Sequence, residues 1–111
     1  MIFITGPLYS GKTEYACSLL GCTPEELEGR AVRDVQELAQ NRADLEALAD
    51  ELARSEVVIA AEVGGGVVPV DPRERADREA AGRLACLLAR RADRVIRVFC
   101  GLPMVLKGAP L

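Results

Sequence analysis

Short apolar runs along the chain are separated by segments that carry helical patterns. Residues 2–5, 57–61 and 94–100 are rich in Ile and Val, which favours buried strands. A fourth run, residues 31–35, suits a strand or a helix, and we interpret it as a short strand with Asp34 near its end. The pattern therefore predicts about four strands.

Helix signals fill the segments between these runs. Residues 12–20 have apolar side chains at helical spacing, and Gly21 after them is a common helix stop. A short helix begins at residues 23–26, TPEE, where Thr23 and Glu26 form a capping-box pattern. A third and a fourth helix are predicted by their apolar faces, and Asp71 is placed to cap the fourth. The apolar face of the third comprises Leu45, Leu48, Ala49 and Leu52, and that of the fourth Ala80, Leu84, Leu87 and Leu88.

Strands that alternate with helices predict an α/β fold, with a small parallel sheet of about four strands flanked by helices. A length of 111 residues makes one domain, residues 1–111, the default expectation. The residues after the last strand are expected to form a short tail with Gly and Pro. Ligands of such sheets bind beyond the carboxyl ends of the strands, so functional residues are expected in the segments that follow them.

The segment after the first strand, GPLYSGKT at residues 6–13, matches the phosphate-loop pattern G-x-x-x-x-G-K-[ST], which makes the predicted fold P-loop NTPase-like. Gly6 and Gly11 permit backbone angles that turn N–H groups toward phosphates, and the following helix adds its positive dipole end. Lys12 would place a charge between the β- and γ-phosphates, and Thr13 would offer a hydroxyl to Mg²⁺. The alternative is a chance glycine turn, but the strand and helix that the motif requires are both predicted. The expected nucleotide-binding residues are Gly6, Pro7, Leu8, Tyr9, Ser10, Gly11, Lys12 and Thr13.

Two acidic residues are predicted to reach the same edge of the sheet as the phosphate loop. Asp34 would take a catalytic, metal-side role together with Thr13, or it is a solvated acid in a helix. Glu62 follows the strand at residues 57–61 and could orient an acceptor hydroxyl or a metal-bound water, or it only caps a loop. The glycines at residues 64–66 would let backbone approach a ligand, or they only permit a tight turn. Lys12, Glu62 and Asp34 are the candidate catalytic residues.

Charge is unevenly distributed along the chain, whose net charge is −3. Residues 1–71 contain 5 basic and 13 acidic residues, and residues 72–111 contain 9 basic and 4 acidic. The acidic first part and an aromatic content of 4% argue against nucleic-acid binding and for a small phosphorylated ligand. Four arginines in the predicted fourth helix would suit phosphate recognition, or they form a solvated face. They are Arg73, Arg75, Arg78 and Arg83.

Other classes are disfavoured by what the sequence lacks. It has no histidine, and its four cysteines show no C-x-x-C spacing, which argues against a zinc site and for reduced thiols in the cytoplasm. No apolar run reaches the length of a membrane span, and the first residues do not follow a signal-peptide pattern. We therefore expect a cytoplasmic protein without a membrane partner.

Several motifs together resemble the bifunctional adenosylcobinamide kinase/adenosylcobinamide-phosphate guanylyltransferase family of cobalamin biosynthesis. The phosphate loop occurs in many families, but the segment AEVGGGVVP followed by arginines, a strand and a Gly-Leu-Pro tail is more specific. The residues that carry the resemblance after the phosphate loop are Ala61 to Pro69, Arg75, Arg78, Gly82, Gly101 to Pro103 and Lys107.

The resemblance implies a P-loop kinase that uses ATP or GTP with Mg²⁺ to phosphorylate the aminopropanol hydroxyl of (adenosyl)cobinamide, a corrinoid, and that forms a homo-oligomer. The chain departs from the family in lacking the histidine that accepts the guanylyl group, so we expect guanylyltransferase activity to be lost. The family's Asn before the Glu is Ala61, and its Asn-Gln pair falls on Ala85 and Cys86. A catalytically degenerate nucleotide-binding regulator or assembly protein is the alternative.

Overall fold

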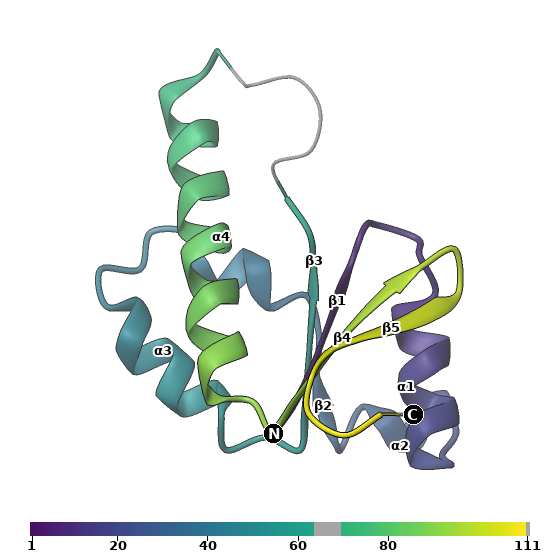
Figure 1. Cartoon of the computed structure of the whole chain (residues 1–111). Coiled ribbons are helices and arrows are strands. Elements are labelled where there is room, and N and C mark those ends of the chain that lie inside the picture. The colour runs from purple at the N-terminus through teal and green to yellow at the C-terminus, as the bar shows by residue number, and fades with distance from the viewer. Residues whose placement is uncertain (64–69, 111) are drawn as a thin grey trace.

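The computed structural model describes residues 1–63 and 70–110, and within them it contains a five-stranded sheet with the strand order β2-β3-β1-β4-β5 (Figure 1). The pairs β2–β3, β3–β1 and β1–β4 are parallel, and the pair β4–β5 is antiparallel. The α/β fold predicted from the sequence is thus confirmed, with a mixed sheet in place of a purely parallel one. The strands are β1 (Ile2–Gly6), β2 (Ala31–Val32), β3 (Val57–Ala61), β4 (Arg94–Phe99) and β5 (Leu102–Lys107).

Strand β5 replaces the tail expected after the last predicted strand. Cys100 and Gly101 both have positive φ, 53° and 75°, as a two-residue hairpin turn of the primed type requires. The turn brings Leu102 opposite Phe99 and starts the antiparallel pairing. Pro103 is tolerated because β5 is the edge strand. The prediction of a tail was wrong because Gly and Pro were interpreted as loop formers.

The helices follow the predicted pattern closely. Helix α1 ends at Gly21 with φ 65°, and α2 has the complete capping box between Thr23 and Glu26. The side chain of Asp71 caps α4 by accepting a hydrogen bond from the backbone N–H of Arg73. The 3₁₀ helix η1 was not predicted. The helices are α1 (Lys12–Leu20), α2 (Pro24–Leu27), η1 (Val35–Ala39), α3 (Leu45–Leu52) and α4 (Pro72–Arg91).

The sheet is covered on both faces, which explains why every residue of β3 is buried. One core lies between the sheet and α3, η1 and α4, and the other between the sheet and α1 and α2. Alternate residues of β1 divide between the cores, since Phe3 joins the first and Ile4 the second. The predicted apolar face of α3 is fully buried, and in α4 Leu84 and Leu88 are buried while Ala80 and Leu87 pack partly against the core.

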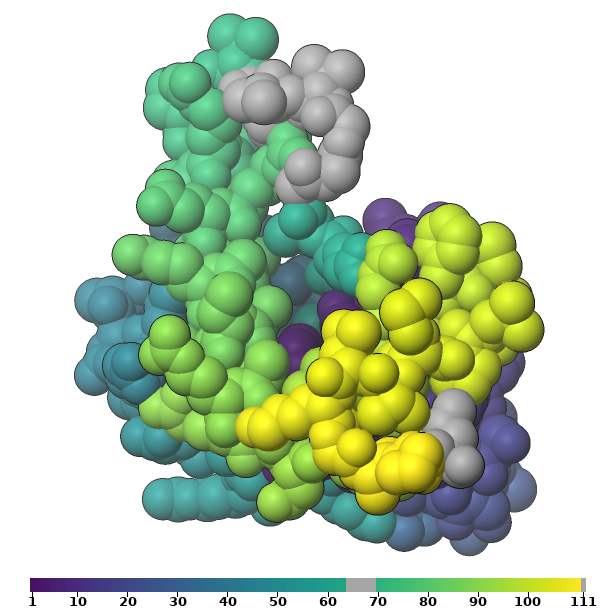
Figure 2. All heavy atoms as spheres, in the orientation of Figure 1, coloured from purple at the N-terminus to yellow at the C-terminus, as the bar shows by residue number. Residues whose placement is uncertain are grey.

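The N-terminal turns of α4 extend past the edge of the sheet at which the parallel strands end (Figure 1). Residues 71–76 are exposed, and they form the projection at the top of the space-filling view (Figure 2). None of the helices in the described part of the chain combines the length and the apolar character that crossing a membrane requires.

Candidate functional site

The predicted phosphate loop connects β1 to α1 at the carboxyl end of the central strands. Three of its residues have positive φ: Gly6 at 155°, Tyr9 at 57° and Gly11 at 92°. Gly11 is the N-cap of α1 and has no side chain with which to bind the first N–H groups of the helix. These groups point out of the helix end and are available to an anion.

Lys12 folds across this loop. Its Nζ atom donates a hydrogen bond to the carbonyl oxygen of Pro7 at 2.6 Å. Partial burial lowers the pKa of the Lys12 ammonium, whereas the negative charges of Asp34, Glu62 and Glu14 act in the opposite direction. The candidate lysine is therefore within electrostatic reach of both candidate carboxylates, as the sheet topology predicted.

A cleft of about 230 Å³ opens beside the loop. Pockets for whole small molecules usually measure about 300–1,000 Å³, so this cleft suits the phosphate end of a nucleotide better than a complete one. Both Thr13 and Asp34 line it, which places the two predicted magnesium ligands on one cleft. The lining residues are Leu8, Tyr9, Ser10, Gly11, Lys12, Thr13, Glu14, Arg33, Asp34 and Ile59.

Ser10 is the buried polar residue of the loop. Its side chain is 6% exposed, and its Oγ atom has no hydrogen-bond partner within the described residues. Buried hydroxyl groups are nearly always hydrogen-bonded, so this one is suited to a ligand or a water molecule. Tyr9, in contrast, is fully exposed, and Leu8 beside it is largely exposed.

The turn between β4 and β5 packs directly against the phosphate loop. The backbone N–H of Gly101 donates to the carbonyl oxygen of Ser10 at 2.8 Å. An added Cβ on Gly11 would come within 3.3 Å of the Cα of Gly101, which shows how closely the two backbones approach. The geometry of the predicted phosphate loop thus depends on the turn before β5, a strand that was not expected from the sequence.

Glu62 lies directly beside the start of the loop. Its backbone N–H donates to the carbonyl oxygen of Gly6 at 2.8 Å. Its carboxylate accepts two hydrogen bonds from Arg97 of β4, from Nε at 2.6 Å and from Nη2 at 3.0 Å. These bonds hold the pKa of the Glu62 carboxyl below its ordinary value against the effect of burial, and the charge of Lys12 lowers it further. Glu62 is therefore ionised at neutral pH.

Asp34 follows β2, whose residues 31–32 are fewer than the predicted run of 31–35. The strand ends early because Val35 turns into η1 and is fully buried in the core. Asp34 occupies the N-cap position of η1 with φ 56°, and its side chain is exposed. The prediction of a strand over residues 31–35 was thus wrong in its extent, since β2 ends before Asp34, but Asp34 still lines the cleft beside the phosphate loop.

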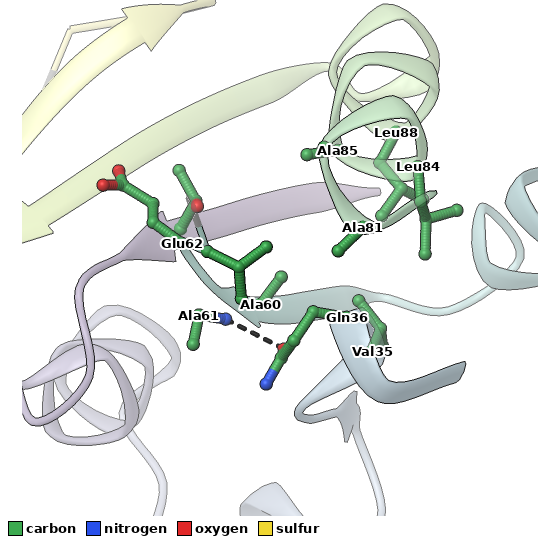
Figure 3. A pocket seen from close by; sticks show the side chains of 12 residues that line it. Val35, Gln36, Ala60, Ala61, Glu62, Ala81, Leu84, Ala85 and Leu88 are labelled. Atoms are coloured by element: carbon green, nitrogen blue, oxygen red, sulfur yellow. Dashed lines mark hydrogen bonds between the residues drawn. The ribbon is translucent and has the colours of Figure 1, made fainter. Parts of the chain in front are cut away.

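A second, smaller cavity of about 100 Å³ lies between the sheet and α4 (Figure 3). Gln36 reaches into it and accepts a hydrogen bond from the backbone N–H of Ala61 at 3.0 Å. Strand β2 is too short to pair with this part of β3. The side chain of Gln36 therefore accepts the hydrogen bond that a longer β2 would have accepted from the backbone of Ala61. Figure 3 shows the Glu62 carboxylate directed away from the apolar side chains of α4. The labelled α4 residues are Ala81, Leu84, Ala85 and Leu88.

Arg97 and Gln36 are the site residues that the sequence reasoning missed. Arg97 interrupts the apolar run at residues 94–100, and a charged side chain at this position was the available signal. Gln36 falls in the segment whose secondary structure was ambiguous. The glycines at residues 64–66, for which a close approach to a ligand or a tight turn was predicted, lie outside the described residues, as does the rest of the segment 64–69.

Three of the candidate arginines of α4, Arg73, Arg75 and Arg83, do not line the cleft beside the phosphate loop. Arg73, Arg75 and Arg83 are exposed along the helix, and the first two belong to its projecting turns. Arg78 is only partly exposed and takes part in an interaction. The structure thus brings together the loop, Asp34 and Glu62, but not the whole basic helix.

Magnesium would suit the oxygens on this edge of the sheet. A nucleotide-bound Mg²⁺ takes one or two carboxylate or hydroxyl ligands from the protein and the remainder from phosphate and water. Thr13 and Asp34 fit this requirement because both line the cleft beside Lys12. Within the ranges 1–63 and 70–110, no three Cys, Asp or Glu side chains gather in a way that could hold a metal without a nucleotide.

Comparison with known proteins identifies the family. The family model for cobinamide kinase / cobinamide phosphate guanyltransferase matches residues 22–106. The bifunctional adenosylcobalamin biosynthesis protein CobP of Pseudomonas aeruginosa is 38% identical over 78 residues, which cover 70% of this chain and 45% of that protein. The match thus spans about half the length of this relative. Because the family model covers most of the chain, the protein belongs to the cobinamide kinase / cobinamide phosphate guanyltransferase family.

Proposed function

We propose that this chain is a nucleotide-dependent kinase that phosphorylates the aminopropanol hydroxyl of cobinamide or adenosylcobinamide. The observation that carries the proposal is the convergence of three residues at one edge of the sheet: Lys12 and Asp34 line the same cleft, and the backbone of Glu62 is hydrogen-bonded to the first residue of the loop. Membership of the family and its description as a cobinamide kinase support the acceptor. The donor is ATP or GTP.

In this proposal the phosphate loop holds the triphosphate. The N–H groups at the start of α1 and the Ser10 hydroxyl donate to phosphate oxygens, and Lys12 exchanges the Pro7 carbonyl for the β- and γ-phosphates. Thr13 and Asp34 would hold Mg²⁺, which supplies charge neutralisation at the transferred phosphoryl group when it is bound. The residues of the loop thus bind the donor and stabilise charge, and they take no part in covalent chemistry.

Glu62 has the role of orienting the acceptor. A carboxylate whose pKa lies below its ordinary value is a weak proton acceptor, so abstraction of the hydroxyl proton is a small part of its contribution. As an ionised group beside the loop it can accept a hydrogen bond from the attacking hydroxyl and align it with the γ-phosphate. As the new P–O bond forms, the bond between the γ-phosphorus and the β,γ-bridging oxygen breaks, the nucleoside diphosphate leaves, and the acceptor proton is released to solvent or phosphate.

We also propose that guanylyl transfer through histidine is absent from this chain, since its 111 residues include no histidine. Self-association is proposed as well. It is supported by large apolar side chains that remain exposed on β4 and β5, since neighbouring exposed apolar side chains often mark a protein–protein contact. They are Phe99, Leu102, Met104 and Leu106.

A nucleotide-binding regulator without catalytic activity is the second candidate. It is favoured by Ala61, Ala85 and Cys86, which stand where the family resemblance leads us to expect amide side chains. It differs from the kinase proposal in predicting nucleotide binding without turnover.

The deciding experiment incubates the purified chain with Mg²⁺, cobinamide and either ATP or GTP, and detects phosphorylated corrinoid by mass spectrometry. We expect the product with wild type and not with Lys12→Ala. Tight nucleotide binding by wild type without any product would favour the regulator, and the lack of both would contradict the two proposals.

A further inference from the structure

Strand β3 has a glutamate immediately before it and another immediately after it, and each is held by an arginine. Glu56 accepts two hydrogen bonds from Arg30, at 2.9 and 2.5 Å, at the edge of the sheet where the strand begins. Glu62 accepts two from Arg97, at 2.6 and 3.0 Å, at the edge where the strand ends. The two pairs have the same chemistry, but only the second lies beside the phosphate loop.

The guanidinium of Arg97 has a ring contact in addition to its hydrogen bonds to Glu62. Arg97 lies on β4, between β1 and β5, and its Cα is in register with that of Thr5 on β1. Its guanidinium carbon lies 5.3 Å from the centroid of the Phe99 ring, an arrangement typical of a cation–π contact. The ring and the carboxylate together fix the plane of the guanidinium, which in turn fixes both oxygens of Glu62.

Two cationic groups within residues 1–63 and 70–110 act on Glu62. Arg97 contacts it from β4, and Lys12 acts on it from the start of α1. Lys12 is expected to bind phosphate when a nucleotide binds. Arg97 lies outside the phosphate loop, and its hydrogen bonds to Glu62 are expected to remain. Arginine also stays protonated at every pH at which the protein is folded. Arg97 is thus expected to stay paired with Glu62 when a nucleotide binds.

We propose that Arg97 is a positioning residue that holds the Glu62 carboxylate in place at the sheet edge beside the phosphate loop. Its importance for turnover rests on the proposed function, in which Glu62 orients the acceptor. The contact itself does not rest on that function and can be measured without any substrate.

The first measurement is a titration of glutamate carboxylates by carbon-13 NMR in wild type, Arg97→Leu, Arg97→Lys and Arg30→Leu. We expect the pKa of Glu62 to rise toward its ordinary value in Arg97→Leu and by less in Arg97→Lys, which keeps a charge but loses the fork. The matched control Arg30→Leu should raise the pKa of Glu56 and leave Glu62 unchanged. An unchanged Glu62 titration in Arg97→Leu would overturn the proposal.

The second measurement compares turnover and nucleotide affinity in the same variants. Arg97→Leu should lower kcat about 10- to 100-fold, as expected for a displaced orienting group, and should change nucleotide affinity less than about twofold. The acid limb of its pH profile should move to higher pH, and Arg30→Leu should behave as wild type. A shifted Glu62 titration with unchanged kcat would overturn the role in turnover. An inactive wild type with the same shift would instead contradict the kinase function and support the contact.

Discussion

The carbonyl oxygen of Val98 lies against the Cα of Gly6, so closely that an added Cβ would overlap it. Val98 belongs to β4 and Gly6 ends the adjacent strand β1, where the chain leaves the sheet to form the phosphate loop. Gly6 also has φ 155°, which side chains rarely adopt. Glycine is therefore required at position 6 for two reasons: its backbone angle disfavours other residues, and the Val98 carbonyl leaves no space for a Cβ.

We expect Gly6→Ala to destabilise the protein by about 2 kcal/mol or more, because strain at positive φ adds to overpacking against backbone. Gly21→Ala is the matched control. Gly21 has φ 65° with nothing within 4 Å of an added Cβ, so only the strain of about 1 kcal/mol should appear. Urea denaturation of both variants measures the difference. Equal losses of stability would show that Val98 can move away without cost.

Lys12→Ala should weaken the binding of ATP or GTP about tenfold or more, the usual effect of losing a hydrogen bond to a charged group. Lys107→Ala is the control, since Lys107 donates to the carbonyl oxygens of Ala89 and Arg90 at the end of α4. It should bind nucleotide as wild type does. Isothermal titration calorimetry checks both variants, and equal affinities for Lys12→Ala and wild type would contradict the phosphate-loop interpretation.

The stability of the fold should fall on acidification. The pKa of the Glu62 carboxyl is lowered in the folded state, so the unfolded chain binds its proton first as pH decreases. The contribution is complete above the ordinary glutamate pKa of about 4.3 and is lost as pH falls through the lower folded-state value. Denaturation of wild type and Glu62→Gln between pH 7 and pH 3 should give a stability difference that shrinks with acidification. A difference independent of pH would show that the pair with Arg97 is not formed in solution.

Helix boundaries in this chain could be predicted because their signals are local. Gly21 ends α1, and the Thr23–Glu26 capping box begins α2, each through contacts within a few residues. The four residues of the apolar face of α3 recur at helical spacing, so the helix could be recognised from them alone. The central strands were recognisable because both faces are buried, which leaves continuous apolar runs.

Features that depend on distant partners could not be predicted in the same way. Strand β5 exists through its pairing with β4 and contains a proline, so its own residues give a weak strand signal. Arg97 acquires its role from Glu62, 35 positions away, and only the sheet order brings β3 and β4 to either side of β1. The order of the strands was enough to predict that Asp34 and Glu62 lie near the phosphate loop. It was not enough to predict residues such as Arg97, whose place in the site depends on one side-chain contact.

No protein–GMP adduct with the properties of a phosphoramidate of histidine should form on this chain. Incubation with GTP and Mg²⁺ followed by intact mass measurement should show the mass of the unmodified chain, because no histidine is available. An adduct that is stable to base and released by acid would contradict this expectation. It would direct attention to the two lysines, Lys12 and Lys107.

The most direct test of the proposed phosphoryl transfer is the kinetics of Glu62→Gln beside those of Glu56→Gln. The two substitutions make the same chemical change at opposite ends of β3, and each removes an arginine-paired charge. If Glu62 orients the acceptor, Glu62→Gln should lower kcat about a hundredfold with little change in nucleotide affinity, and Glu56→Gln should keep wild-type turnover. Equal activity of Glu62→Gln and wild type would remove Glu62 from the mechanism and contradict the account.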